Sequence, residues 1–227
     1  PEPTPTPGDV VCEATGSGSC LYISPTAANG NGSYENPYRT FYAALTDSRL
    51  VPGSVVYAMN GRFTADHAMV ISRNPYFDGD RIAMIGITDM DGYLVDTPAY
   101  SVPNGTATNP ITITAYPGTN PVIDMRGAYI REDFQAMSHS AVYIEGKSHW
   151  IIDGLTIYGG MVNIAGGTDG QYSHDITIRN NTIADVEIDG GDNPGLVRID
   201  RTYGADGVYN VLIEGNTLHS IYDINQT

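Results

Sequence analysis

The sequence predicts an all-β solenoid, and two repeated strand patterns carry this prediction. The first pattern occupies residues 149–157 and returns at 175–183 and 210–218 with changed residues and an unchanged alternation of β-branched positions. The copies align in two apolar columns, Ile152 with Ile178 and Ile213, and Ile157 with Ile183 and Leu218. Units that repeat in this way stack as coils, because each unit buries its apolar face against the next.

A second, shorter pattern precedes the first in every copy. It covers residues 141–145, 161–165 and 196–200, with Val142, Val162 and Val197 in one column and Ile144, Ile164 and Ile199 in another. Side chains of a strand alternate between its two faces. The intervening positions therefore turn outward, namely Tyr143, Asn163 and Arg198, with Glu145, Ala165 and Asp200 beyond them.

A third strand begins at Thr156, and only two residues separate it from the preceding strand. These corner pairs are Gly154-Leu155, Asn180-Asn181 and Gly215-Asn216. Gly and Asn tolerate left-handed backbone, so we expect a sharp corner. The pattern resembles the right-handed parallel β-helix of the pectate-lyase type, whose coils have one tight corner that often holds stacked asparagines. Asn181 and Asn216 fit that ladder, whereas Leu155 departs from it.

The resemblance implies a right-handed single-stranded parallel β-helix, and the N-terminal part supplies its lid. Residues 21–45 are expected to form a strand, a Gly/Asn loop and a short helix. Phe41, Ala44 and Leu45 have the i, i+3, i+4 spacing that gives the helix one apolar side. A short N-terminal capping helix is therefore predicted, because the first coil would otherwise expose its core.

Two earlier coils sharpen the resemblance. Residues 54–64 and 110–125 each predict a strand, a tight turn and a second strand. Together with Tyr-Ile-Ser-Pro at 22–25 and Asn-Pro-Tyr-Arg-Thr-Phe at 36–41, their order resembles the start of β-helical polysaccharide-active enzymes, family nine polysaccharide lyases among them. The similarity covers about residues 21–218. It implies a polysaccharide as partner, and it is more specific for the fold than for the reaction.

We expect one β-helix domain over residues 10–227, preceded by a Pro/Thr linker at residues 1–9. The domain is expected to lack its C-terminal coils, because after Leu218 the sequence shows neither a capping helix nor a polar closing strand. In the lyases that it resembles, the coils that bind calcium and bear the base lie further along. An open C-terminal end of this kind predicts self-association or a covering partner.

Composition excludes several classes of function. The formal net charge is −15 with Lys147 as the single lysine, so the chain lacks the clustered basic groups that nucleic acid requires. No apolar run reaches membrane-spanning length.

Cys12 and Cys20 lie close together in a flexible segment, which predicts a local disulfide; two free thiols are the alternative. With the Pro/Thr repeat, this disulfide indicates a secreted or cell-surface protein.

Loop lengths indicate where a binding groove would lie. The connections on both sides of the first strand of each coil carry insertions, at residues 65–81, 88–109, 125–140, 166–174, 185–195 and 201–209. Insertions confined to one face usually mark its binding surface. The predicted substrate-binding residues of this groove are Tyr143, Asn163, Glu145 and Arg201.

A lyase that acts on a uronate must neutralise the carboxylate and remove the adjacent proton, tasks that suit a cation and a basic side chain. The candidate catalytic residues are Arg198, Lys147 and His139. A solvated turn lysine and an ion-paired Arg198 are the structural alternatives. Sequence spacing shows no metal motif among the five histidines, and His149 is interpreted as a cap at a strand entrance.

An acidic stretch predicts a calcium site, because carboxylate oxygens in a flexible loop suit Ca²⁺. Its proposed ligands are Asp189, Asp192 and Asp200, with Asp185 and Glu187 in the same expected loop; an ordinary acidic surface is the alternative. Asp153, Arg179 and Glu214 alternate in sign on another face and are interpreted as a structural charge ladder.

Three functions remain open from the sequence. The first is a polysaccharide lyase or its N-terminal part. The second is a non-catalytic β-helix that binds glycans or assembles end to end. The third is a glycoside hydrolase, which needs two carboxylates; Glu145 and Asp200, two coils apart, would be roughly 9.6 Å apart by strand spacing.

Overall fold

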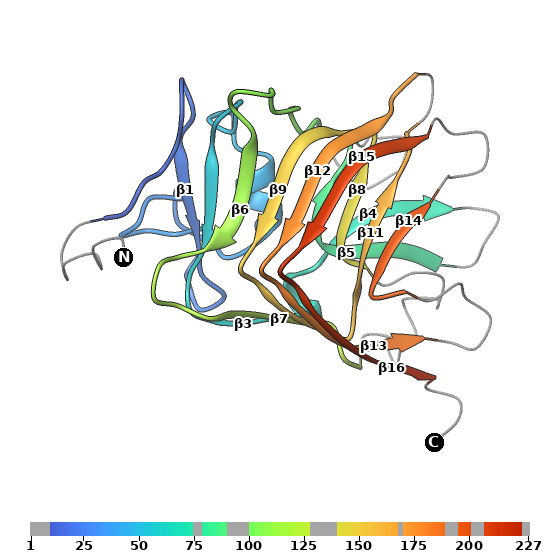
Figure 1. Cartoon of the computed structure of the whole chain (residues 1–227). Coiled ribbons are helices and arrows are strands. Elements are labelled where there is room, and N and C mark those ends of the chain that lie inside the picture. Colours follow the sequence, from blue (N-terminus) through green and yellow to red (C-terminus); the bar gives the residue numbers. More distant parts are fainter. Residues whose placement is uncertain are drawn as a thin grey trace.

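The computed structural model describes residues 10–74, 79–89, 100–127, 140–167, 170–188, 195–200 and 207–223. These residues form three sheets that wind around one core, with the N-terminal coils at one end and the C-terminal coils at the other (Figure 1). Sheet A contains, in spatial order, β1 (Cys20–Ile23), β2 (Val55–Ala58), β6 (Ile111–Ala115), β9 (Ser148–Asp153), β12 (Ser173–Arg179) and β15 (Val208–Glu214). Sheet B contains β3 (Gly61–Thr64), β7 (Pro121–Asp124), β10 (Thr156–Tyr158), β13 (Thr182–Ile188) and β16 (Thr217–Asp223). Sheet C contains β4 (Met69–Asn74), β5 (Gly79–Ile87), β8 (Ser140–Glu145), β11 (Met161–Ala165) and β14 (Val197–Asp200).

The strand register confirms the repeat alignment. In sheet A, Ile178 pairs with Ile152 on one side and with Ile213 on the other. In sheet C, Ile164 pairs with Ile144 and with Ile199. Each column points into the core, and its members are fully buried in every coil but the last. The apolar alternation therefore sets the register, since a shift of one residue would turn these isoleucines to solvent.

The corner between sheets A and B contains the predicted asparagine ladder. The Asn181 amide donates to Asn216 Oδ1 at 3.1 Å and to the Ile152 carbonyl at 3.0 Å, and its Oδ1 accepts from the Leu155 backbone N–H at 2.9 Å. Asn181 is almost fully buried. Leu155 adds no side-chain amide to the ladder, but its backbone is bonded by the asparagine of the next coil.

Helix α1 (Phe41–Leu45) closes the N-terminal end of the core, as predicted. Thr40 caps it, with Oγ1 accepting from the Ala43 N–H at 3.3 Å. Phe41, Ala44 and Leu45 are buried, and the Phe41 ring lies 5.0 Å from that of Phe63. Of the described helices, none has both the length and the hydrophobicity needed to cross a bilayer.

The predicted disulfide joins Cys12 to Cys20, whose Cα atoms lie 5.7 Å apart. It holds the segment before β1 against the outer face of sheet A. There Tyr22 stacks on Tyr57 at 5.5 Å and donates to the Val11 carbonyl at 2.8 Å. The linker proposed at residues 1–9 lies outside the described residues.

Two expected insertions were wrong in part. The stretch 65–81 contains a 3-10 turn, η1 (Ala65–His67), and the strand β4, which pairs antiparallel with β5. The acidic stretch that begins at Asp185 is not a loop at its start, because β13 extends through Ile188. The second error comes from length, because β13 continues past the short pattern that the repeat alignment defines. The first has another cause, because β4 lies outside the repeat and forms through antiparallel pairing with β5.

Each sheet ends at the last coil with β14, β15 or β16 at its edge (Figure 1). The apolar residues there are exposed, namely Ile199, Leu212, Ile213, Leu218 and Ile221. Ile213 and Leu218 occupy the same columns as the buried Ile178 and Ile183. The end of the described stack is therefore an apolar surface bordered by unpaired strand edges.

Candidate functional site

The outer row of sheet C contains the predicted groove residues in register. Tyr143 of β8 pairs with Asn163 of β11, which pairs with Arg198 of β14. Tyr143 and Asn163 are only 4% and 5% exposed, so this part of the row is covered and not open as an exposed floor would be. Arg198 remains partly exposed and forms an ion pair with Asp200 of the same strand. The accessible part of the row therefore lies toward β14.

Asn163 has an unusual environment for a buried amide. Its Oδ1 is shielded from solvent and accepts no hydrogen bond from the part of the chain that the structure describes. Buried carbonyl oxygens almost always have a partner, so a partnerless one indicates a buried water or ion at this position or a functional role. Because Arg198 stands next to Asn163 in the ladder, an acceptor and a cation lie side by side on this face.

Glu145 and Asp200 lie in one column of sheet C, with Ala165 between them. Two ladder steps separate them, which corresponds to roughly 9.6 Å between strands. Glu145 Oε2 accepts a hydrogen bond from Thr88 Oγ1 at 3.3 Å. The two carboxylates thus have the register that a pair of acid and base groups would require, at the wide end of the usual range.

Lys147 is buried at the connection from sheet C to sheet A. Its Nζ donates to Asp89 Oδ1 at 2.5 Å and to the Val102 carbonyl at 2.6 Å. Burial raises the pKa of the Asp89 carboxyl, but the hydrogen bonds from Lys147 and Ser101 and the lysine charge outweigh it, and the pKa is lowered. This geometry favours a structural role for Lys147, in which it holds two earlier segments against the start of β9.

The acidic residues of β13, Asp185 and Glu187, contact Arg126 and Gly127 of an earlier coil, not residues of the sheet C groove. Arg126 lies near both Asp124, at 2.8 Å, and Asp185, at 3.5 Å, and it covers the Tyr158 ring. Burial raises the pKa of the Glu187 carboxyl, although the Gly127 N–H donates to it at 2.7 Å. Asp185 and Glu187 therefore belong to a cluster on sheet B. The sequence pattern could not show this, because Arg126 comes from two coils earlier.

Four predicted site residues lie outside the described residues: His139, Arg201, Asp189 and Asp192. Their roles stay predictions. On the other outer face, Arg179 pairs with Asp153 at 2.8 Å and stands in register with Glu214. This arrangement matches the structural charge ladder expected for Asp153, Arg179 and Glu214.

Two of the histidines, which sequence spacing does not group, lie close together in the structure. His149 of β9 and His174 of β12 lie on adjacent strands together with Asp175, and their ligand atoms are all within 4.8 Å of one another. Linear spacing hides this cluster because the two histidines come from different coils. The repeat alignment already placed His149 and Asp175 in one column, and that was the signal that could have found it.

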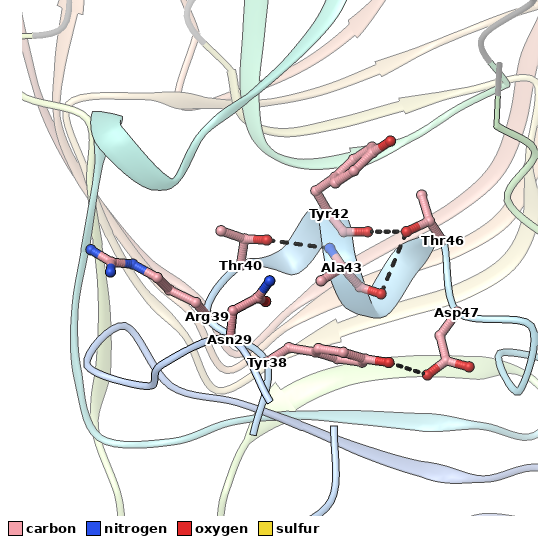
Figure 2. A pocket seen from close by; sticks show the side chains of 8 residues that line it. All are labelled: Asn29, Tyr38, Arg39, Thr40, Tyr42, Ala43, Thr46 and Asp47. Atoms are coloured by element: carbon pink, nitrogen blue, oxygen red, sulfur yellow. Dashed lines mark hydrogen bonds between the residues drawn. The ribbon is translucent and has the colours of Figure 1, made fainter. Parts of the chain in front are cut away.

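A pocket of about 500 Å³ opens beside α1 and is lined by residues of the N-terminal part of the chain (Figure 2). Tyr38, Tyr42 and Asp47 contribute to its wall, and Tyr38 donates to Asp47 at 2.7 Å. Hydrogen bonds that cap and close the helix engage the Thr40 and Thr46 hydroxyls. The pocket is a consequence of the N-terminal lid and contains none of the predicted site residues.

Comparison with solved structures identifies the fold class. Over 88% of its length the chain superposes on 54% of a rhamnogalacturonan lyase, with a TM-score of 0.50 and 16% identity. The fold is a right-handed, pectate-lyase-like parallel β-helix. A GH136 lacto-N-biosidase from Eubacterium ramulus (TM-score 0.46, 19% identity, 86% of this chain and 30% of that chain) and pectate lyase Pel9A (0.43, 16%, 76% and 41%) are similar at a lower level. No protein-family model and no curated protein matches the sequence.

This β-helix spans about half of the rhamnogalacturonan lyase and less of the other two proteins. At such identities the likeness establishes the fold alone. Any activity has to be argued from the residues on the outer face of sheet C.

Proposed function

We propose that this β-helix is the carbohydrate-active part of a protein that binds a uronate-containing polysaccharide along sheet C and cleaves it as a lyase. The observation that carries the proposal is the adjacency of Arg198 to the partnerless Oδ1 of Asn163. A uronate offers a carboxylate for the guanidinium, and a water or ion at the buried amide oxygen would link that oxygen to the sugar hydroxyls. The disulfide supports an extracellular site of action, where such polymers occur.

The chemistry that this face would support is β-elimination. Arg198 pairs with the uronate carboxylate and stabilises the negative charge that develops when the neighbouring carbon loses its proton. A base takes that proton, the electron pair of the C–H bond forms the new C=C bond, and the glycosidic C–O bond breaks. We assign the proton transfer to His139, because Arg198 is engaged with the uronate carboxylate and the buried Lys147 Nζ donates to Asp89 and to the Val102 carbonyl.

Calcium belongs to the same proposal. Asp200, with Asp189 and Asp192, would hold the ion. The carboxylate of Asp200 and the buried, partnerless amide oxygen of Asn163 are oxygen donors of the kind that Ca²⁺ takes. Bound Ca²⁺ would supply the positive charge that attracts a uronate to a chain of net charge −15. Because Arg198 already bonds to Asp200, the ion has to share this carboxylate with the arginine.

Two other functions have observations of their own. The column of Glu145 and Asp200 has the spacing for a hydrolase pair. The exposed apolar end favours a non-catalytic module that binds glycans and assembles end to end. Their products distinguish the three functions: a lyase yields unsaturated ends, a hydrolase yields reducing ends alone, and a binding module yields neither.

We expect calcium-dependent binding of pectate or alginate, with slow release of unsaturated ends that absorb in the ultraviolet. We also expect Ca²⁺ to raise the thermal midpoint relative to EDTA, since an ion that binds only the native state must stabilise it. The measurements are an absorbance assay and a melting curve on a panel of pectate, alginate and neutral plant or algal glycans. Strong calcium-independent cleavage of a neutral glycan would contradict the proposal, and equal midpoints would remove calcium from it.

A further inference from the structure

One cluster of potential metal ligands lies on the outer face of sheet A, apart from the sheet C face. His149 Nε2 is 3.8 Å from Asp175 Oδ2, and His174 Nδ1 is 2.6 Å from the same oxygen. The residues come from β9 and β12, which pair directly. All three side chains are partly exposed, so an ion can reach them from solvent.

The local backbone explains how these side chains converge. His149 and Asp175 have left-handed backbone, with φ of 57° and 53°, and Asn210 repeats it at 54° in the next coil. His, Asp and Asn are the residues that accept this conformation most readily after glycine. The ladder pairs Ser148 with His174 and then Trp150 with Ile176, so the left-handed residues lie between paired positions. A local break of this kind re-aims side chains, as a β-bulge does.

Contacts from β15 fix the orientation of two of the three groups. The Tyr209 ring stacks on the His174 ring at 4.8 Å and 5°. Asn210 Nδ2 donates to Asp175 Oδ1, so Oδ2 is the oxygen that faces the histidines. Metal-binding residues are usually held by outer contacts of this type, which set ring orientation and leave one atom free to coordinate.

We propose that His149, His174 and Asp175 bind one divalent transition metal ion, with Zn²⁺ as the best fit. Two imidazole nitrogens and one carboxylate oxygen are a donor set that zinc takes with water in the fourth position. Ca²⁺ is a poor candidate, because it takes six to eight oxygen ligands.

Distances in the cluster are compatible with coordination after small side-chain rotations. A tetrahedral ion at about 2.0–2.1 Å from each ligand needs ligand atoms roughly 3.3 Å apart. The separations of 2.6 and 3.8 Å bracket that value, and all ligand atoms lie within 4.8 Å. A bound ion would clasp two adjacent coils at the entrance of sheet A, where the His174 N–H donates to the Lys147 carbonyl at 3.2 Å.

The test is zinc binding to the untagged, metal-free chain by calorimetry, with Co²⁺ absorption as a report on coordination geometry. We expect one ion per chain and a rise in the thermal midpoint. His149→Asn, His174→Phe and Asp175→Asn should each weaken the affinity by about tenfold or more. His149→Asn preserves the backbone, since asparagine adopts the same conformation at position 210, and His174→Phe preserves the stack on Tyr209. His219→Asn, at an exposed histidine of β16, is the matched control and should bind zinc like the parent.

Failure of the metal-free chain to bind zinc would overturn the proposal. So would binding that all three variants retain, or binding that His219→Asn abolishes. Each variant is first melted without metal; if one does not fold, the other two decide. Ca²⁺ in excess should not displace zinc. None of these readouts depends on polysaccharide cleavage.

Discussion

Replacing Asp89 with alanine should lower the free energy of unfolding by about 2–3 kcal/mol. Lys147 Nζ is buried, and the change leaves its charge with the Val102 carbonyl as its remaining hydrogen-bond partner among the described residues. Breaking a buried ion pair on one side is costly, because the remaining charge keeps its desolvation penalty. We place the loss below the usual range of about 3–5 kcal/mol, because the Asp89 side chain is 40% exposed and water can enter. Urea denaturation of variant and parent measures it.

Lys147→Met is the matched control and should cost less, since the Asp89 carboxylate left behind can be hydrated. The pair also predicts a pH dependence. Because the pKa of Asp89 is lowered in the folded state, its contribution is present above its unfolded pKa of about 3.9 and is lost as the pH falls through its lower folded pKa. The acid limb should therefore flatten in Lys147→Met. Equal losses for the two variants would contradict this assignment.

The 227-residue chain should self-associate in solution through its last coil. The inward columns of β15 and β16 end in the exposed Ile213 and Leu218, and no described strand pairs with the outer edges of these two strands. Apolar edges of this kind pair with a second copy, because stacking buries the columns and satisfies the backbone groups. Static light scattering across a concentration series should give a mass above 24.3 kDa that rises with concentration.

Ile213→Asp with Leu218→Asp should shift the chain to the monomer, because charges in the core columns cannot be buried at a stacked end. Leu212→Asp serves as control: Leu212 is also exposed, but it points to the outer face of the same strand. A parent that stays monomeric at high concentration would count against stacking. Dissociation by the control alone would indicate lateral contact between outer faces.

The strands of each coil and their pairing could be predicted from the sequence alone, because strand register depends on short-range alternation that is repeated in several copies. Ile152, Ile178 and Ile213 could be aligned without coordinates, and the ladder pairs them. The Asn181–Asn216 corner was predictable for the same reason. The strand β4 was not, since it lies outside the repeat and depends on antiparallel pairing with β5.

Predictions about the site were harder, since they depend on what each side chain meets across coils. Nothing in the local sequence of Lys147 shows that Asp89 lies within 2.5 Å of it. The burial of Tyr143 and Asn163 likewise depends on contacts from outside their strands. Predicting the histidine cluster would have required both the repeat alignment and knowledge of the left-handed backbone, which directs side chains of neighbouring coils toward one point.

Arginine replacement on two faces of the β-helix tests the central claim most directly. Arg198 of sheet C and Arg179 of sheet A are both partly exposed and both paired with an aspartate, so they differ mainly in the face that they occupy. With calcium present, Arg198→Gln should weaken pectate or alginate oligomer binding by about tenfold or more, the loss expected for a hydrogen bond between charged groups. Arg179→Gln should leave the affinity unchanged. Calorimetry of both variants gives the comparison; equal affinities for them, or a loss confined to Arg179→Gln, would contradict a uronate site on sheet C.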